Sequence, residues 1–448
     1  MSELPKGWVG IKLGDVIELK YGKSLPAKQR SDSGFPVYGS NGVVGLHHEP
    51  LVLGGGLIVG RKGSFGEVHL SVQDFSPIDT TYYIDSFPTG TMKYWYYQLK
   101  NLPLTKLNRS TAIPGLNRED AYAQNILLPP DAEQKRIVAK LDEVLAQVDI
   151  IKAQLDRIPA ILKRFRQSVL AAAVSGKLTE EWRGESDYIF HEEIQAEFPS
   201  SWNIKTIDDI GRVKGGKRLP KGEELVTNDT GHPYIRAGQL KEGTVIQGSE
   251  ARNIQMYLEP HVQAQISRYT VLEGDAYITI VGASIGDAGI IPATHNGANL
   301  TENAAKICEL HNDVFGPFVG LLLRSQFIQR LIKLEIKSGA QGKLALMRIK
   351  TLPFPKATFE EQKEIVRLVD HYFVFADTIE AQVKKAQARV DNLTQSILAK
   401  AFRGELVAQD PNDEPADKLL ERIAQARTEA EVLAKTVKKA GRKVKATS

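Results

Sequence analysis

An internal duplication is the feature of this sequence that most limits what the chain can fold into. Residues 133–178 align without gaps with residues 361–406 at a constant offset of 228, and 18 of the 46 aligned positions are identical. A weaker match, at an offset of 194, relates the segments that begin at Trp8 and Trp202. Because self-similarity of this kind reports a repeated structural unit, we expect two related halves.

Both copies of the repeat space their apolar residues alternately by four and three positions. Sustained over about five heptads, this spacing predicts two long helices of about 40 residues, or about 60 Å, that pair along an apolar seam. Asp131 with Gln134, and Thr358 with Glu361, match N-terminal capping pairs, and Gly176 and Gly404 stand where C-terminal caps belong. The predicted coiled-coil and subunit-interface residues are Ile137, Leu141, Val148, Ile151, Leu155, Phe165, Ile365, Val369, Ile379, Val383, Leu393 and Ile397.

Short β-rich runs separated by Gly, Asn and Asp turns precede each helix. The predicted fold class is therefore α+β, with two β-rich domains and two long antiparallel coiled-coil helices related by a pseudo-twofold internal repeat. The expected segments are a first β-rich domain at 1–130, a helix at 131–180, a linker at 181–200, a second β-rich domain at 201–356, a helix at 357–406 and a basic tail at 407–448.

Composition limits the class of protein but does not identify a partner. The 58 Lys and Arg residues against 54 Asp and Glu residues give a net charge of +4, and residues 432–448 alone carry six cationic residues and no acid. The rest of the chain is thus slightly acidic, so a generally basic nucleic-acid binder is not indicated. A single cysteine, the absence of an apolar run near ~18 residues and the absence of an apolar N-terminal signal core favour a cytoplasmic protein.

No motif in the sequence predicts a catalytic or metal site. Residues 211–218 nearly match a phosphate-binding P-loop, but Arg218 stands where Ser or Thr would bind magnesium. The acidic residues at 130–135 crowd into one helical turn and are explained by capping, and the histidines lack metal-ligand spacing. We therefore expect no catalytic residue and no metal ligand on this chain.

Polar and basic residues in glycine-flanked loops are the remaining candidates, because Arg, Lys, Asn and Gln read base edges and contact phosphates. Each of them taken alone is better explained as a solvated surface residue, but as a repeated set they favour DNA binding. The candidate DNA-binding residues in the first β-rich domain are Lys20, Lys23, Lys28, Arg30, Arg61, Lys62, Ser64, Asn108, Arg109, Asn117 and Arg118. Those in the second are Lys214, Lys217, Arg218, Arg236, Gln239, Arg252, Asn253, Lys337, Gln341, Lys343 and Arg348.

Four blocks of the sequence resemble a known family. Residues 128–138 (Leu-Pro-Pro-Asp-Ala-Glu-Gln-Lys-Arg-Ile-Val), 161–170, 176–183 (Gly-Lys-Leu-Thr-Glu-Glu-Trp-Arg) and 392–406 closely resemble the conserved regions of the specificity subunits of type I restriction-modification enzymes, especially the K-12-like type. The resemblance extends through residue 410 and is much stronger in the helices than in the β-rich domains.

The resemblance implies a non-catalytic DNA-recognition subunit of a complex that methylates adenine and cleaves DNA. Each β-rich domain would be a target-recognition domain that reads one half of a bipartite, asymmetric DNA target, and the helices would act as a spacer. The implied partners are double-stranded DNA, two modification (methyltransferase) subunits that use S-adenosylmethionine, and restriction (endonuclease and translocase) subunits that use ATP with Mg. No cofactor is expected on this chain.

Two other interpretations stay open. The chain could be the specificity subunit of a fused type II-like enzyme, in which methylase and nuclease share one partner chain. It could instead be a coiled-coil scaffold without a nucleic-acid role, although the duplicated domains with basic loops do not favour that interpretation.

Overall fold

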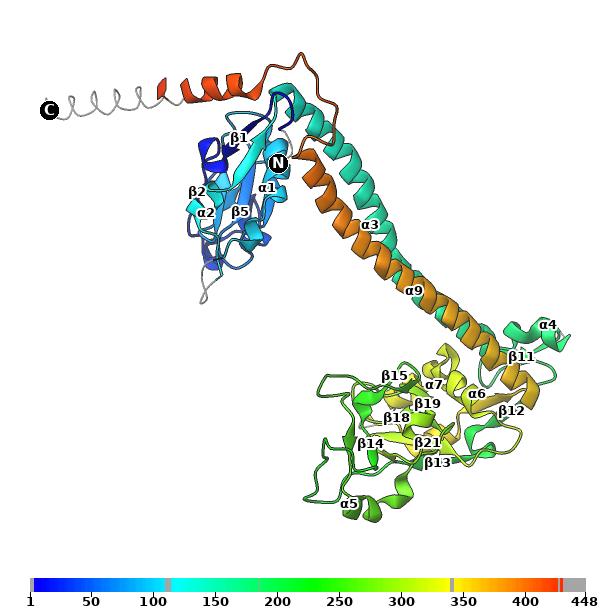
Figure 1. Ribbon diagram of the computed structural model, residues 1–448. Coiled ribbons are helices and arrows are strands. Elements are labelled where there is room, and N and C mark those ends of the chain that lie inside the picture. Colours follow the sequence, from blue (N-terminus) through cyan, green and yellow to red (C-terminus); the bar gives the residue numbers. More distant parts are fainter. Residues whose placement is uncertain (1–3, 109–113, 185, 339–341, 426–427, 430–448) are drawn as a thin grey trace. The chain divides into compact units, whose positions relative to one another are not determined.

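The computed structural model describes residues 4–108, 114–184, 186–338, 342–425 and 428–429. The chain divides into two compact units, the first formed by residues 1–156 and 384–448 and the second by residues 157–383. The two longest helices, α3 (Asp131–Val174) and α9 (Phe359–Ala401), each contribute residues to both units (Figure 1).

The described residues of the first unit form three small sheets. The strand β1 (Val9–Lys12) pairs with β9 (Asn125–Leu128). A four-stranded antiparallel sheet has the order β2-β8-β5-β6, and a three-stranded sheet has the order β4-β3-β7, in which β3 and β7 are parallel. Its other strands are β2 (Lys20–Tyr21), β3 (Phe35–Gly39), β4 (Gly42–His47), β5 (Gly56–Gly60), β6 (Val68–Ser71), β7 (Ser76–Pro77) and β8 (Thr81–Ile84), and its short helices include α1 (Met92–Asn101), α2 (Arg118–Tyr122) and a helix over 416–425.

The second unit repeats this topology. The strand β12 (Asn203–Thr206) pairs with β22 (Pro353–Lys356), the four-stranded sheet has the order β13-β21-β18-β19, and the three-stranded sheet has the order β17-β14-β20 with β14 and β20 parallel. Its sheet strands are β13 (Arg212–Gly215), β14 (Pro233–Ile235), β17 (Met256–Tyr257), β18 (Ala276–Thr279), β19 (Ala288–Ile290), β20 (Asn299–Leu300) and β21 (Ala304–Cys308), and its helices are α5 (Pro260–Gln265), α6 (Gly316–Arg324), α7 (Gln326–Ser338) and α8 (Leu346–Lys350). The duplication therefore includes the β-rich domains, where sequence similarity is weak.

Some elements occur in the second unit only, among the described residues. A short helix α4 (Glu180–Arg183) and a hairpin of β10 (Tyr188–His191) and β11 (Ala196–Pro199) follow α3, and β15 (Leu240–Lys241) pairs with β16 (Thr244–Val245). These insertions make the second unit larger without changing the repeated sheets.

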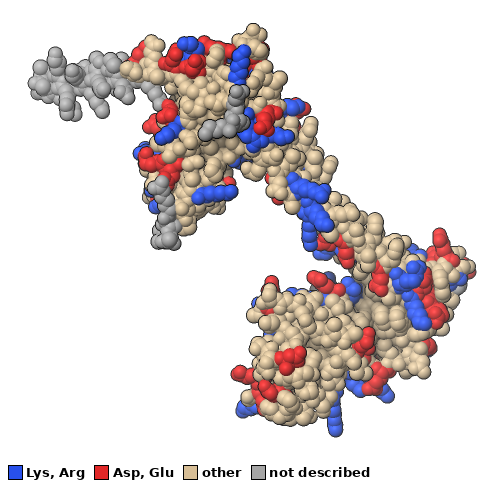
Figure 2. All heavy atoms as spheres, in the orientation of Figure 1, with Lys and Arg blue, Asp and Glu red and all other residues tan. Residues whose placement is uncertain are grey.

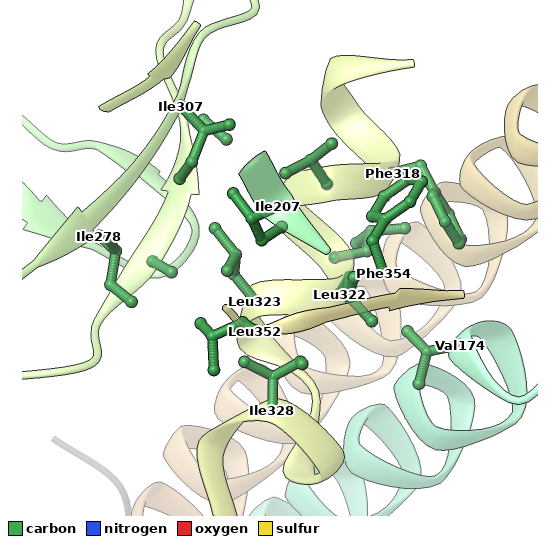
Figure 3. Close-up of a cluster of buried hydrophobic side chains, with 14 of the residues drawn as sticks. Val174, Ile207, Ile278, Ile307, Phe318, Leu322, Leu323, Ile328, Leu352 and Phe354 are labelled. Carbon is green, nitrogen blue, oxygen red and sulfur yellow. The ribbon is translucent and has the colours of Figure 1, made fainter. Parts of the chain in front are cut away.

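In each unit the β-rich domain shares one hydrophobic core with an antiparallel pair of helix segments. In the first unit, Ile137 and Leu141 from the start of α3 pack in the same core as Ile397 and Leu398 from the end of α9. In the second unit, Val169 and Val174 from the end of α3 pack with Ile365 from the start of α9, and Figure 3 shows Val174 of this core beside Phe318 and Leu322 of α6 and Phe354 of β22. The predicted α+β fold, with two long antiparallel helices and an internal repeat, is confirmed.

The predicted helix ends are correct in three of four places. Gly176 and Gly404 follow the helices in the left-handed region, with φ of 74° and 78°. The Thr358 hydroxyl accepts a hydrogen bond from the Glu361 backbone N–H at 3.2 Å, as an N-cap does. The exception is Asp131, which is the first residue of α3 and not its cap.

Candidate nucleic-acid interface

Each long helix begins against the β-rich domain that precedes it, where a tryptophan donates to a buried carboxylate. Trp8 Nε1 donates to Glu133 Oε2, and Trp202 Nε1 donates to Glu361 Oε2, both at 2.9 Å. The two carboxylates are 1% and 2% exposed. A buried carboxylate that accepts a tryptophan N–H fixes the orientation of the helix, because the alternative is an unpaired charge without water.

The next residue of each helix adds a second, equivalent anchor. Gln134 and Gln362 are fully buried, and their side-chain amides donate to Pro129 O and Ala357 O, each at 2.9 Å. These contacts correct the interpretation of Gln134 and Glu361 as capping partners, because their side chains bind the preceding β-rich domain or the residues just before the helix. The acidic cluster at the start of α3 is thus part of the scaffold.

The loop that resembles a P-loop is a structural turn in both units. A Cβ atom at Gly22 would lie 2.1 Å from Ile78 O, and one at Gly216 would lie 2.0 Å from Thr301 O. The next backbone N–H groups, of Lys23 and Lys217, donate to Pro77 O at 3.0 Å and to Leu300 O at 2.9 Å. Glycine is required here for close backbone approach, and these N–H groups are not free to bind a phosphate.

Several candidate residues of the first unit are bound to other parts of the protein. Lys20 forms a 2.6 Å ion pair with Asp85, which raises the pKa of the lysine. The Arg30 guanidinium donates to two backbone carbonyls, Asn117 caps α2, and Asn108 accepts a hydrogen bond from the Gly115 N–H at 3.3 Å. Lys23, Lys28, Lys62 and Ser64 are exposed, as are Asn108 and Asn117, and Arg61 and Arg118 are half-buried. Arg109 lies outside the described residues.

In the second unit many candidates are likewise paired internally. Lys214 pairs with Glu309, Arg218 with Glu302 at 3.0 Å, and Arg348 with Glu335 at 3.1 Å. These three side chains are exposed in spite of their pairs, Lys217, Arg252 and Lys343 are exposed as well, and Asn253 is half-buried. The side chain of Lys337 and all of Gln341 lie outside the described part of the chain.

Two candidates of the second unit hold its interior together. The Arg236 guanidinium donates to Ala251 O at 3.0 Å and to Ile254 O at 2.6 Å. Gln239 is fully buried and its amide donates to Gln255 at 3.1 Å. Gln239 therefore does not present its amide at the surface, and the expectation that it contacts DNA does not fit this position.

The predicted seam residues are mostly buried. Ile137, Leu141, Val148, Ile365, Val369, Val383 and Ile397 are at most 7% exposed, Leu155, Phe165 and Ile379 are half-buried, and Ile151 and Leu393 are 45% and 46% exposed. Further large apolar side chains on the two helices are more exposed still, namely Ile150, Ile161, Val374 and Phe375. The helices therefore keep apolar surface that their own pairing does not cover.

Charged side chains of both signs are distributed over the one face that Figure 2 draws. On the face shown in Figure 2, Lys and Arg side chains alternate with Asp and Glu side chains over the described surface of both units. Among the described residues no group of His, Cys, Asp and Glu side chains could hold a metal ion, and no described helix is long and apolar enough to cross a membrane.

Comparison with known proteins decides the family. The model of the type I restriction modification DNA specificity domain matches twice, at residues 5–160 and 199–387, once for each half of the repeat. The chain belongs to the type I restriction-modification specificity subunits. The predicted family is thus confirmed, and with it a DNA specificity subunit that is a non-catalytic component of a type I system.

Curated relatives are similar over most of their length. The chain is 36% identical to the EcoBI specificity subunit of Escherichia coli, over 78% of this chain and 74% of the relative. It is 30% identical to the EcoDI specificity subunit of the same species, over 99% of both chains.

Solved structures share the fold at low identity. A chain from a study of complex assembly and conformational transition of the type I R-M system matches with a TM-score of 0.61 at 16% identity, over 90% of this chain and 100% of that one. The HsdS subunit from Thermoanaerobacter tengcongensis matches with a TM-score of 0.55 at 18% identity, over 90% and 98%. At these identities the likeness shows the fold.

The specificity subunit contains structural residues that the motif search missed. Trp8, Glu133, Trp202 and Glu361 stand at equivalent positions of the two repeats, so the duplication itself was the available signal. Tyr21, whose ring centre is 5.0 Å from the guanidinium carbon of Arg61 and 5.2 Å from that of Arg118, was not among the predicted residues, because those were polar and basic residues of loops.

Proposed function

We propose that each β-rich domain, with the expected boundaries 1–130 and 201–356, is a target-recognition domain that reads one half of a bipartite DNA target. The observation that carries the proposal is that both domains build the same sheets in the same order from different loop residues. Two domains that share one scaffold but differ in their surface side chains are suited to recognise two different DNA sequences. The target is then asymmetric, with an unread gap between its halves.

The two helices supply the spacer and the docking surface in this proposal. Their exposed apolar residues include Ile150 and Leu393 in the first unit and Val374 and Phe375 in the second. A modification subunit would cover one such surface in each unit, so that two copies bind per chain. These subunits bring S-adenosylmethionine for adenine methylation, and restriction subunits bring ATP with Mg for cleavage.

Long-read methylome sequencing of a host that expresses this chain with its modification subunit tests the reading function. The proposal predicts methylated adenines in one motif with two specific parts, different from each other and separated by a fixed number of unspecified bases. A continuous or palindromic motif would contradict the proposal that the two domains recognise different half-sites. The absence of any methylation motif would favour the scaffold interpretation.

Substitution of an exposed helix residue tests the docking function. Phe375 is 56% exposed, so Phe375→Asp should leave the helix pair folded. It should place a charge in the proposed apolar contact with the modification subunit and lower the affinity for that subunit tenfold or more. The assembly is measured by analytical ultracentrifugation of the mixed subunits. Phe375→Leu keeps the apolar surface and is the matched control, which should assemble as the wild-type chain does.

A changed recognition motif would count against this assignment of roles. Any complex that Phe375→Asp still forms should methylate the wild-type motif, because helix α9 docks the partner and does not read bases.

A further inference from the structure

Tyr21, at the end of β2, lies close to two arginines that come from distant parts of the first unit. The guanidinium carbon of Arg61, just after β5, is 5.0 Å from the centre of the Tyr21 ring, and that of Arg118, the first residue of α2, is 5.2 Å from it. The tyrosine is 49% exposed. One aromatic ring at the surface therefore contacts two cations within the usual range of a cation–π interaction.

Hydrogen bonds hold the two arginine-bearing segments together. The Leu116 N–H donates to Arg61 O at 2.9 Å, and Arg61 Nη1 donates to Asp79 O at 3.0 Å. The side chain of Asn117 accepts from the Glu119 N–H at 2.9 Å, which fixes the first turn of α2. The positions of both guanidinium groups are therefore restricted by hydrogen bonds among these segments and by the Tyr21 ring that both groups contact.

Neither guanidinium is neutralised in the way that the candidate cations Lys20, Lys214, Arg218 and Arg348 are. Among the described residues Arg61 has no ion pair, and Arg118 has only its neighbour Glu119, at 3.7 Å. Arg118 Nε is buried and makes no hydrogen bond with a described residue. In contrast, Lys20 next to Tyr21 is paired with Asp85 at 2.6 Å. Because Arg118 Nε is buried and Arg61 Nη1 donates to Asp79 O, the donors left for an external acceptor are the other guanidinium nitrogens of the two residues.

We infer that Arg61 and Arg118 contact base edges in one half of the DNA target and that Tyr21 is the positioning residue that holds them. The inference rests on the proposed function and assigns the reading to a particular site. Arginine recognises guanine through two parallel hydrogen bonds to O6 and N7, and this contact requires a fixed guanidinium plane. A ring against both groups restricts their rotation before DNA arrives, which reduces the entropy lost on binding.

The expected ligand is therefore a base pair with guanine in the major groove rather than a phosphate. Arginine also binds phosphate through two parallel hydrogen bonds, but a phosphate contact carries no base information and its loss would weaken binding to every sequence alike. The aromatic side chain separates the two possibilities, because losing it should harm base discrimination more than general DNA affinity.

The test uses the assembled complex of this chain with its modification subunit. The motif of the wild-type complex is first read from a methylome, and the motif of each variant is then compared with it. Arg118→Lys and Arg61→Lys keep the charge but lose the planar donor pair, so each should relax the motif at a guanine in one half only. Binding to a duplex with the intact motif should fall about tenfold or more for each variant, while binding to a scrambled duplex stays the same.

Tyr21 is tested with two substitutions. Tyr21→Phe keeps the ring and should retain the motif, whereas Tyr21→Leu removes the ring's negative face and should relax it at the same half. Lys100→Ala is the matched control, since Lys100 lies 4.8 Å from the centre of the Tyr96 ring on α1 but outside the proposed site. This control should change neither motif nor affinity.

The outcomes separate the inference from the proposed function. An unchanged motif in both lysine variants overturns the inference, as does an equal loss of affinity for intact and scrambled duplexes, which would indicate phosphate contacts. Failure of the proposed function looks different, because the wild-type complex itself would then show no bipartite motif. Thermal unfolding of each variant verifies that the first unit is folded, and Tyr21→Phe keeps the test open if Tyr21→Leu does not fold.

Discussion

The two helix starts, one in each unit, use the same tryptophan–glutamate bond in different surroundings. In the second unit Glu361 Oε1 also accepts from Arg183 at 2.7 Å and from the Thr179 hydroxyl at 2.8 Å. In the first unit Glu133 Oε1 is buried and makes no hydrogen bond with a described residue. Burial raises the pKa of Glu133, and the Trp8 hydrogen bond and the Arg136 charge only partly oppose this effect.

The segments that follow the helices explain the difference. In the second unit Arg183 of α4, in the segment after α3, pairs with Glu361 at the start of α9. In the first unit Asp413, in the segment after α9, pairs with Arg136 of α3 at 2.6 Å. Both units thus tie the segment after one helix to the start of the other, with the charges exchanged. The same geometry is therefore supported by a different ion pair in each unit. Both carboxylate oxygens of Glu361 accept hydrogen bonds, whereas only one oxygen of Glu133 does so with a described residue.

The largest expected effect comes from removing the negative charge at each helix start. Glu361→Gln should lower the stability of the start of α9 by about 3 kcal/mol, because it leaves the buried Arg183 without its counterion. Glu133→Gln should change the stability of the start of α3 by about 1 kcal/mol or less, because its amide oxygen can still accept from Trp8. Hydrogen exchange of the first turns of both helices measures the two effects, and equal losses would contradict the comparison.

Substitution of the two tryptophans should give smaller losses of stability, and here the larger loss should occur in the first unit. Trp8→Phe removes the hydrogen bond that Glu133 has and should cost about 2 kcal/mol, whereas Trp202→Phe leaves Glu361 with Thr179 and Arg183 and should cost about 1 kcal/mol. Both variants lose the same volume of side chain, so each is the control for the other. The denaturant dependence of the remaining tryptophan fluorescence, combined with hydrogen exchange, gives the two values.

The smallest effect is a pH dependence in the first unit. Because the folded pKa of Glu133 is raised, its contribution to stability is fully present below the unfolded pKa and is lost as the pH rises through the folded pKa. The wild-type first unit should therefore lose some stability from about pH 4 upward, and Glu133→Gln should lack this loss. Unfolding of both proteins between pH 4 and 7.5 provides the test. Parallel pH profiles would mean that Glu133 does not titrate abnormally.

Much of the scaffold could be predicted because it is encoded locally or by the repeat. The heptad spacing correctly predicted the two long helices, and Gly176 and Gly404 correctly predicted where the helices end. The Trp8–Glu133 bond could not be found in the same way, since it joins residues that are 125 positions apart and no local pattern requires it. The local pattern pointed instead to capping, which is correct for Thr358 and wrong for Asp131.

The candidate site was predicted less well than the scaffold, because residue type does not reveal burial or internal pairing. Gln239 has the chemistry of a base reader but is fully buried, and Arg236 binds backbone carbonyls of its own domain. Arg61, Tyr21 and Arg118 come from three separate segments of the chain. Their spacing in the sequence matches no motif, so it did not predict that they lie close together.

Exchange of one recognition domain tests the central claim, that each unit reads its own half of the target, most directly. Residues 1–125 are replaced by the corresponding domain of a relative with a different target, and the methylome of the host is sequenced. One half of the motif should change to that of the donor while the other half and the exchanged chain's assembly stay as they were. An unchanged motif, or a change in both halves at once, would contradict the account.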